Sequence, residues 1–128
     1  MKCPCGSGSS YEACCGKFHL GPDLPETAEQ LMRSRYSAFV TKSIPYLKDS
    51  LWPKYQKDFD EVGFTDRAAN SLWLGLTILK TTGGTIDDTK GTVTFTARSM
   101  VNGTPHTQTE NSLFKKKAGR WYYVSEVR

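Results

Sequence analysis

The sequence lacks any long hydrophobic segment, and it has no cysteine after residue 15. No apolar run approaches the roughly 18 residues that a transmembrane helix needs, and the first residues contain no apolar core of a secretory signal. We therefore predict a cytoplasmic protein that does not enter a membrane. Secreted disulfide scaffolds spread their cysteines along the chain, so four cysteines confined to residues 3–15 argue against that class.

The composition suits one folded domain with a short appended module. The 128 residues are 38% hydrophobic and include three Trp, six Tyr and six Phe, which supply a core and argue against intrinsic disorder. The formal net charge is +4, which permits contact with an acidic partner without requiring one.

Residues 1–22 differ in composition from the rest of the chain. They are rich in cysteine, glycine and serine and hold too few apolar residues for a core of their own. Residues 23–26 then form a short linker. The sequence therefore predicts an N-terminal module over residues 1–22 and a second domain over residues 23–128.

The first part of this domain predicts helices. Thr27 followed by Gln30 matches a capping box, and the apolar residues that follow at helical spacing include the charged residue Arg35. A second helix is predicted over residues 44–52, and a short third helix over residues 66–72.

The second half predicts an antiparallel sheet. Strands are expected over residues 72–80, 92–97, 106–116 and 120–127. Asn102-Gly103 favours a tight hairpin because both residues tolerate positive φ. Helices followed by a strand meander indicate the α+β class.

The four cysteines follow the pattern Cys3-Pro-Cys5, eight residues, then Cys14-Cys15. Four thiolates around one point suit tetrahedral zinc, and four protein ligands leave no open position, so we predict one structural Zn²⁺ ion. Disulfide bonds, or reduced thiols without metal, are the alternatives. His19 is either a substitute ligand or an ordinary surface histidine.

This segment also carries a family resemblance. It consists of CPCGSG at residues 3–8, Tyr11, and CCG at residues 14–16. The pattern resembles the SEC-C motif, the zinc module at the C-terminus of SecA. The resemblance implies that the four cysteines bind one zinc ion.

Blocks along the rest of the chain extend the resemblance. They are LMRSRYSAF at 31–39, WLGL at 73–76, GTVTF at 91–95, ENSLF at 110–114 and GRWYYV at 119–124. Together they are similar to the YchJ-type family of uncharacterised bacterial proteins, which join a SEC-C motif to a domain similar to nuclear transport factor 2 (NTF2). This implies a curved antiparallel sheet wrapped by helices into a cone, the NTF2-like or cystatin-like fold. The family has no assigned activity, so the resemblance implies no reaction.

Folds of this type often hold a pocket inside the cone, as the resemblance implies. The possible pocket residues share inward faces of the helix and strands: Arg35, Tyr36, Glu110, Ser112, Trp121 and Tyr123. In one interpretation, Glu110 is a general base. In the other, Arg35 and Glu110 form a buried ion pair that holds helix against sheet. No residue is assigned a catalytic role, and an enzyme is the less favoured interpretation.

The primary functional hypothesis is a binding or adaptor protein. Its N-terminal module would contact a protein or ribosome-associated partner, by analogy with SecA, through Lys2, Tyr11, Lys17 and Phe18. The alternatives are a cone that binds a small-molecule ligand or acts as an enzyme, and a module that only stabilises the sheet. The lysine run at 115–117 predicts a solvated hairpin tip or, more weakly, a contact with nucleic-acid phosphates.

Overall fold

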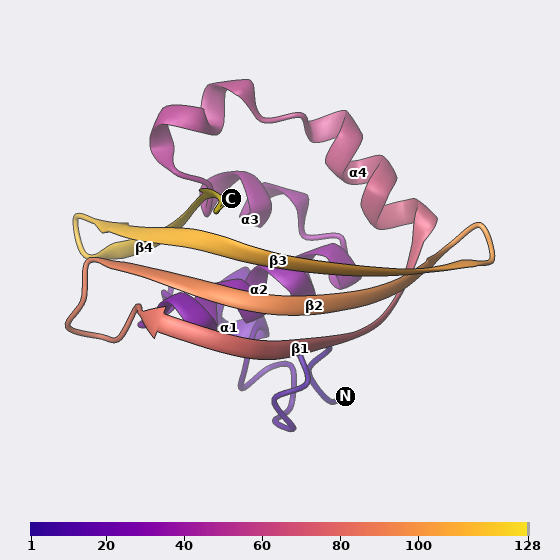
Figure 1. The fold of residues 1–128 in the computed structure, drawn as a ribbon, viewed down its shortest axis with the longest axis horizontal. Helices are drawn as coiled ribbons and strands as arrows, with labels where there is room; N and C mark the ends of the chain where they lie inside the picture. The colour runs from indigo at the N-terminus through magenta and orange to yellow at the C-terminus, as the bar shows by residue number, and fades with distance from the viewer. Residues whose placement is uncertain (128) are drawn as a thin grey trace.

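The computed structural model describes residues 1–127, and its central feature is a four-stranded antiparallel sheet (Figure 1). The strands lie in the order β1-β2-β3-β4. They are β1 (Ser71–Gly83), β2 (Lys90–Val101), β3 (Thr104–Lys117) and β4 (Arg120–Glu126). Each strand pairs with the next one along the chain, so the predicted meander is confirmed.

Five helical segments precede the sheet in the sequence. They are α1 (Gly16–Leu20), α2 (Ala28–Thr41), α3 (Ile44–Asp49), the 3₁₀ helix η1 (Pro53–Asp58) and α4 (Glu61–Asn70). In Figure 1, α2 lies behind the sheet, α3 and α4 lie beyond its β3–β4 side, and the N-terminal module lies below β1. Helices therefore enclose one face of a curved sheet, as the α+β cone requires. None of the helices within residues 1–127 is long and apolar enough to span a bilayer.

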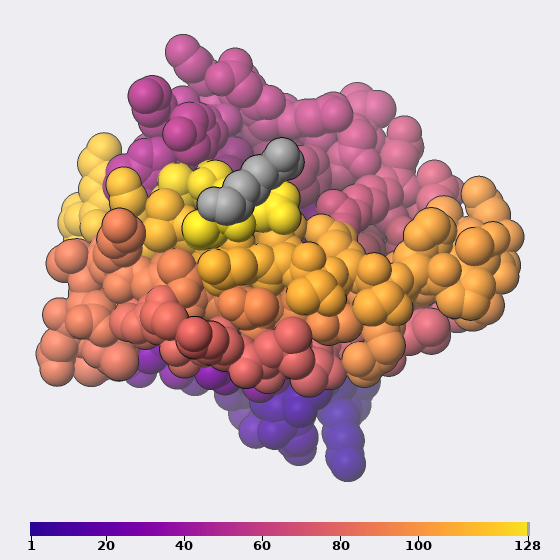
Figure 2. Space-filling view, in the orientation of Figure 1, coloured from indigo at the N-terminus to yellow at the C-terminus, as the bar shows by residue number. Residues whose placement is uncertain are grey.

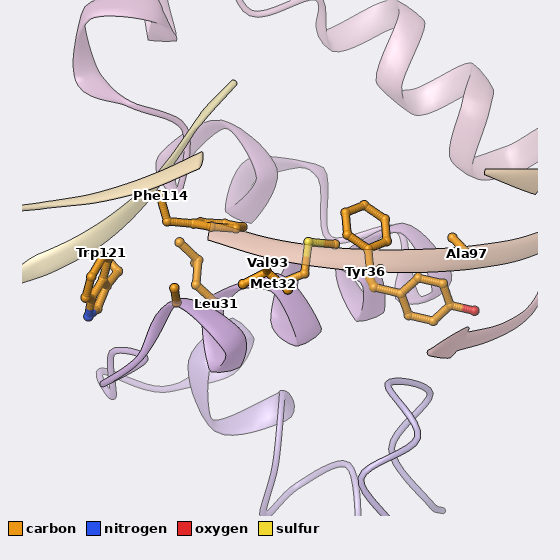
Figure 3. Packing of buried hydrophobic residues seen from close by; sticks show 9 residues of the cluster. Leu31, Met32, Tyr36, Val93, Ala97, Phe114 and Trp121 are labelled. Carbon is orange, nitrogen blue, oxygen red and sulfur yellow. The ribbon is translucent and has the colours of Figure 1, made fainter. Parts of the chain in front are cut away.

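The main core lies between α2 and the concave face of the sheet. Leu31 and Met32 project from α2 towards β2, where Val93 and Ala97 are buried on one face (Figure 3). Trp121 closes one end of this cluster. Burial alternates along β2, as expected for a strand with one face in a core.

Local signals explain where the elements begin and turn. The Thr27 side chain accepts a hydrogen bond from the Gln30 backbone N–H (3.1 Å), so the predicted N-cap of α2 is confirmed. Asn102 and Gly103 have φ angles of 52° and 81°, which confirms the predicted hairpin turn between β2 and β3.

Two predicted helices have different bounds in the structure. The helix expected over 66–72 begins at Glu61, because the Asp60 side chain caps it by accepting from the Gly63 N–H (3.0 Å). The helix expected over 44–52 ends at Asp49. Trp52 instead donates its backbone N–H to the Tyr123 carbonyl of β4 (2.8 Å), so the sheet captures this segment.

Candidate functional site

The four cysteine side chains converge in the N-terminal module. Their Sγ atoms all lie within 4.8 Å of one another, with 3.7 Å between Cys5 and Cys14 and 4.0 Å between Cys14 and Cys15. Zn–S bonds of about 2.3 Å in a tetrahedron place sulfurs about 3.8 Å apart, so the cluster fits the ion. All four cysteines are free, so the disulfide alternative is wrong.

Tight turns bring the two cysteine pairs together. Gly6 and Gly8 have φ angles of 84° and 88°, a region that glycine adopts without strain. The second pair leads directly into α1, where the Gly16 N–H donates to the Tyr11 carbonyl (2.7 Å). A Cβ atom on residue 16 would lie 2.7 Å from that carbonyl oxygen, so this turn requires glycine.

The thiols interact strongly with one another. A hydrogen bond with Cys15 lowers the pKa of the Cys5 thiol to about 4, and burial opposes this shift. The same hydrogen bond and burial raise the pKa of Cys15. The Ser7 hydroxyl lies 3.2 Å from the Cys14 sulfur. The cluster therefore shares protons among its sulfurs, and a metal ion would displace them on binding.

Polar contacts attach the cysteine cluster to α2. The Arg33 guanidinium donates from Nη1 to the Cys5 carbonyl oxygen (2.8 Å), and the Cys3 sulfur lies 3.5 Å from the Ser37 hydroxyl. The module thus has a fixed position against the helix that also lines the interior of the cone.

His19 joins the module to the domain and is not a metal ligand. Its Nδ1 lies 2.7 Å from the Tyr11 hydroxyl and its Nε2 lies 2.8 Å from the Ser34 carbonyl oxygen. Its ring also contacts Tyr46, with 4.7 Å between centroids. Burial lowers the pKa of His19 and favours the neutral imidazole. Because both ring nitrogens are engaged, the substitute-ligand interpretation is wrong, and His19 is half-buried rather than an ordinary surface residue.

Two of the four residues expected to contact a partner are not accessible. Lys2 and Lys17 are exposed, whereas Tyr11 is only 8% exposed and Phe18 only 9%. Tyr11 packs among the cysteines, which is the physical reason for this correction.

A cavity of about 120 Å³ lies between the helices and the concave face of the sheet. Its walls are largely aromatic and come from α2, α4 and the strands: Tyr36, Phe39, Phe64, Trp73, Phe95 and Tyr123. Four polar side chains also line it, namely Arg35, Arg67, Gln108 and Glu110. A second cavity of about 350 Å³ shares Arg67, Trp73, Ala97 and Gln108 with the first.

Arg35 is a buried cation in this cavity without a carboxylate partner. Its Nη1 donates to the Leu47 carbonyl oxygen (2.8 Å) and to the Ser50 hydroxyl (2.7 Å). Its guanidinium lies over the Tyr123 ring, 4.7 Å from the centroid. Burial lowers the pKa of Arg35 to about 10. No carboxylate within residues 1–127 lies within 4.0 Å of this guanidinium.

Glu110 faces the same cavity but is bound by neutral donors. Its carboxylate accepts hydrogen bonds from Gln108 (3.0 Å), from the Ser112 hydroxyl (2.5 Å) and from the Tyr123 hydroxyl (3.2 Å). The predicted ion pair between Arg35 and Glu110 is therefore wrong, because Tyr123 contacts both groups and stands between them.

Comparison with known proteins identifies the family. The family model described as "YchJ, middle NTF2-like domain" matches residues 27–126. The chain belongs to the YchJ family. A UPF0225 protein of Haemophilus influenzae (strain PittEE) is 45% identical over 122 residues, which cover 95% of this chain and 75% of that protein. A UPF0225 protein of Geobacter sulfurreducens is 43% identical, with 95% and 76% covered.

Two solved structures share the whole architecture. The solution structure of a SEC-C motif containing protein from Rhodopseudomonas palustris has a TM-score of 0.90 and 33% identity, and the match covers 99% of this chain and 98% of that one. The crystal structure of a SEC-C motif containing protein from Psychrobacter arcticus has a TM-score of 0.81 and 26% identity, with 96% and 80% covered. The resemblance seen in the sequence is therefore confirmed for family and fold.

The structure brings together four of the six possible pocket residues. Arg35, Tyr36, Glu110 and Tyr123 line the first cavity. Ser112 is fully buried behind Glu110 and positions its carboxylate. The sixth residue, Trp121, does not line this cavity.

Trp121 belongs to the core rather than to the cavity wall. It is 1% exposed, and its indole Nε1 donates to the Glu26 carbonyl oxygen (3.1 Å). Arg67, Trp73 and Gln108 were not among the possible pocket residues predicted from the sequence, although all three line both cavities. The strand pattern held one usable signal, since Gln108 shares a face of β3 with Glu110.

The lysine run lies beside aromatic rings instead of extending freely into solvent. Lys115 and Lys117 place their Nζ atoms 5.9 and 5.7 Å from the centroid of Trp52. Lys116 donates to the Ile86 carbonyl oxygen (2.7 Å).

Proposed function

We propose that this protein holds a structural zinc ion in its cysteine cluster and binds a small organic molecule in the cavity of its NTF2-like domain. The observation that carries the ligand-binding proposal is the open cavity beside Glu110, into which the unpaired cation Arg35 faces. A core without a cavity, in which Arg35 and Glu110 formed an ion pair, would have argued against ligand binding.

The donor set supports zinc with a structural role. Cys3, Cys5, Cys14 and Cys15 supply four sulfur ligands, the number that closed structural sites use. The zinc ion would neutralise the thiolate charge and fix a segment that has almost no apolar core. Because four protein ligands complete a tetrahedron, no position remains for a substrate, and the proposal assigns the ion no part in a reaction.

The lining of the cavity supports ligand binding. Small-molecule sites are concave and mostly apolar, with a few polar groups that orient the ligand. Here aromatic rings supply the walls, and the polar groups come from α2, α4 and β3. Hydrogen bonds from Gln108, Ser112 and Tyr123 hold the Glu110 carboxylate in one orientation. The side chains are thus preorganised for recognition.

A fragment screen by NMR on the full chain tests this proposal. We expect bound fragments to shift the resonances of Tyr36, Phe95 and Ala97. Ala97→Leu, which adds volume inside the cavity, should abolish binding. Thr96→Leu is the matched control, because residue 96 lies on the opposite face of β2. The absence of any fragment that Ala97→Leu displaces would overturn the proposal.

Docking of a protein or ribosome-associated partner on the module is a second candidate function. It is favoured by the way the module projects from the body of the molecule (Figure 2), with Lys2 and Lys17 exposed on it. Cross-linking of the full chain in cell extract would recover a defined partner, and Lys2→Glu with Lys17→Glu would lose it. Equal recovery with the double variant would argue against this function.

A further inference from the structure

We infer that the cavity ligand is a small aromatic carboxylate, whose anionic group is bound by Arg35, Arg67 and the indole N–H of Trp73. This inference rests on the proposed function, since it names the chemical class of the molecule bound in the same cavity.

The positive charge of Arg35 is incompletely compensated. The side chain is 6% exposed, and both of its hydrogen bonds leave from Nη1. Within residues 1–127, Nε and Nη2 donate no hydrogen bond and no carboxylate lies within 4.0 Å of the guanidinium. These two nitrogens are open to the cavity, since they are not among the fully buried atoms that lack a partner. A buried cation is costly unless it is paired and hydrogen-bonded. An anionic ligand in the cavity would supply both the countercharge and the missing acceptors.

Trp73 of β1 carries a side-chain donor without a partner among the described residues. Trp73 Nε1 is buried, and it is the single buried side-chain nitrogen or oxygen within residues 1–127 that has no hydrogen-bond partner. Trp73 lines both cavities. Buried polar groups in folded proteins are almost always paired. Because Trp73 Nε1 itself has almost no accessible surface, a ligand acceptor reaches this N–H only when neighbouring side chains shift as the ligand binds.

Arg67 places a second cation beside the Trp73 indole. The Arg67 guanidinium lies over the rings of Phe39 and Trp73, at 5.1 and 5.9 Å from their centroids. It donates to Gln108 Oε1 (2.9 Å), and its remaining N–H groups are available to the ligand, since no other hydrogen bond holds it within the described chain. The planar guanidinium fork matches the geometry of a carboxylate.

The charge and size of the cavity select among anions. Two guanidinium groups and the Glu110 carboxylate leave a net charge of +1 on the lining of the first cavity, which favours a monoanion over a dianion such as phosphate. Its volume of about 120 Å³ is close to the roughly 150 Å³ of a cavity that binds benzene. Six aromatic side chains form the walls, so a single aromatic ring fits, and substituents can extend into the adjoining cavity of about 350 Å³.

Calorimetric titration of the full chain tests the inference, with sodium benzoate as the probe. Benzamide is the neutral control of the same shape, sodium acetate lacks the ring, and inorganic phosphate carries the extra charge. We expect benzoate to bind at least about tenfold more tightly than any of the three, since a hydrogen bond to a charged group is worth about tenfold or more in affinity. In NMR spectra, the indole N–H resonance of Trp73 should shift downfield with benzoate.

Substitutions at two positions test the assigned contacts without removing the buried Arg35. Trp73→Phe keeps the ring but deletes the orphaned donor. It should weaken benzoate binding about tenfold, weaken benzamide binding less because the amide oxygen is an uncharged acceptor, and leave the melting temperature of the free protein equal or higher. Arg67→Gln should weaken benzoate binding similarly, and Arg67→Lys should restore part of it.

The outcomes separate the inference from the proposed function. Benzamide binding as tightly as benzoate, or full benzoate affinity in Trp73→Phe, would overturn the carboxylate inference and leave the small-molecule site intact. Failure of every aromatic probe and fragment to bind would overturn both.

Discussion

The Arg35 guanidinium lies over the ring of Tyr123, with 4.7 Å between the guanidinium carbon and the ring centroid. The two residues come from α2 and β4, so the contact connects the central helix to the last strand. Because no carboxylate within residues 1–127 pairs with Arg35, the face of this ring and the two hydrogen bonds from Nη1 are the contacts that compensate the buried charge.

Substitutions of Tyr123 separate its ring from its hydroxyl. Tyr123→Phe keeps the ring and loses the hydrogen bond to Glu110, so we expect a loss of about 1 kcal/mol in the free energy of unfolding. Tyr123→Leu also removes the cation–π contact and should cost about 2 kcal/mol more. Urea denaturation measures both. Equal losses in the two variants would show that the ring does not stabilise the Arg35 charge.

Metal analysis tests the cysteine cluster. Protein purified under reducing conditions without chelator should contain one zinc ion per chain, and Cys14→Ser should contain less than one. Removing the ion should lower the melting temperature by about 5 °C or more, because the module has little core of its own and packs on α2. Glu12→Gln, an exposed change in the same module, is the control and should retain its zinc. Unchanged metal content in Cys14→Ser would contradict the assigned ligand set.

The cysteine cluster and the sheet order could be predicted because their signals are local. The four cysteines lie within 13 residues of chain joined by glycine turns, and Asn102-Gly103 fixes the β2–β3 hairpin through its own backbone preferences. The cap formed by Thr27 and Gln30 is equally local. Each of these features depends on residues that are neighbours in sequence.

The lining of the cavity depends on long-range geometry that the sequence pattern does not contain. Trp73 lies in a nearly continuous apolar run with a bulge between Trp73 and Gly75, so alternation cannot assign its face. Arg67 lines the cavity from α4, whose bounds (Glu61–Asn70) differ from those predicted for this helix (66–72). The separation of Arg35 from Glu110 depends on where Tyr123 of β4 lies, which strand periodicity alone cannot give.

Arg33 provides a test of how the module is attached to the domain. Its guanidinium donates to the Cys5 carbonyl oxygen and also pairs with Glu29 (3.0 Å). Arg33→Met removes both contacts and should cost about 1.5–3 kcal/mol, whereas Glu29→Gln removes only the partly exposed ion pair and should cost less than about 1 kcal/mol. Arg33→Met should also speed the transfer of zinc to a coloured chelator, because the turn that carries Cys5 loses its anchor. Equal transfer rates in the two variants would contradict an anchoring role.

The raised pKa of Tyr46 predicts that the folded protein loses stability in alkaline solution. Burial raises the pKa of Tyr46 to about 12 in the folded protein, while the hydrogen bond with Ser34 acts in the opposite direction. A tyrosine in the unfolded chain ionises near pH 10. The folded state therefore keeps a proton that the unfolded state loses, so the contribution of Tyr46 to stability is complete below about pH 10 and is lost as the pH rises towards 12.

Urea denaturation between about pH 9 and pH 11.5 measures this effect. Wild-type protein should lose more stability over that interval than Tyr46→Phe, which has no hydroxyl to ionise. The pKa of Tyr123 is also raised to about 12, chiefly by burial, and that of Arg35 is lowered, but both residues are present in the two proteins. The difference between the two curves therefore isolates Tyr46. Parallel curves would mean that the hydroxyl of Tyr46 ionises as readily in the folded protein as in the unfolded chain, and that its contact with Ser34 is open to water.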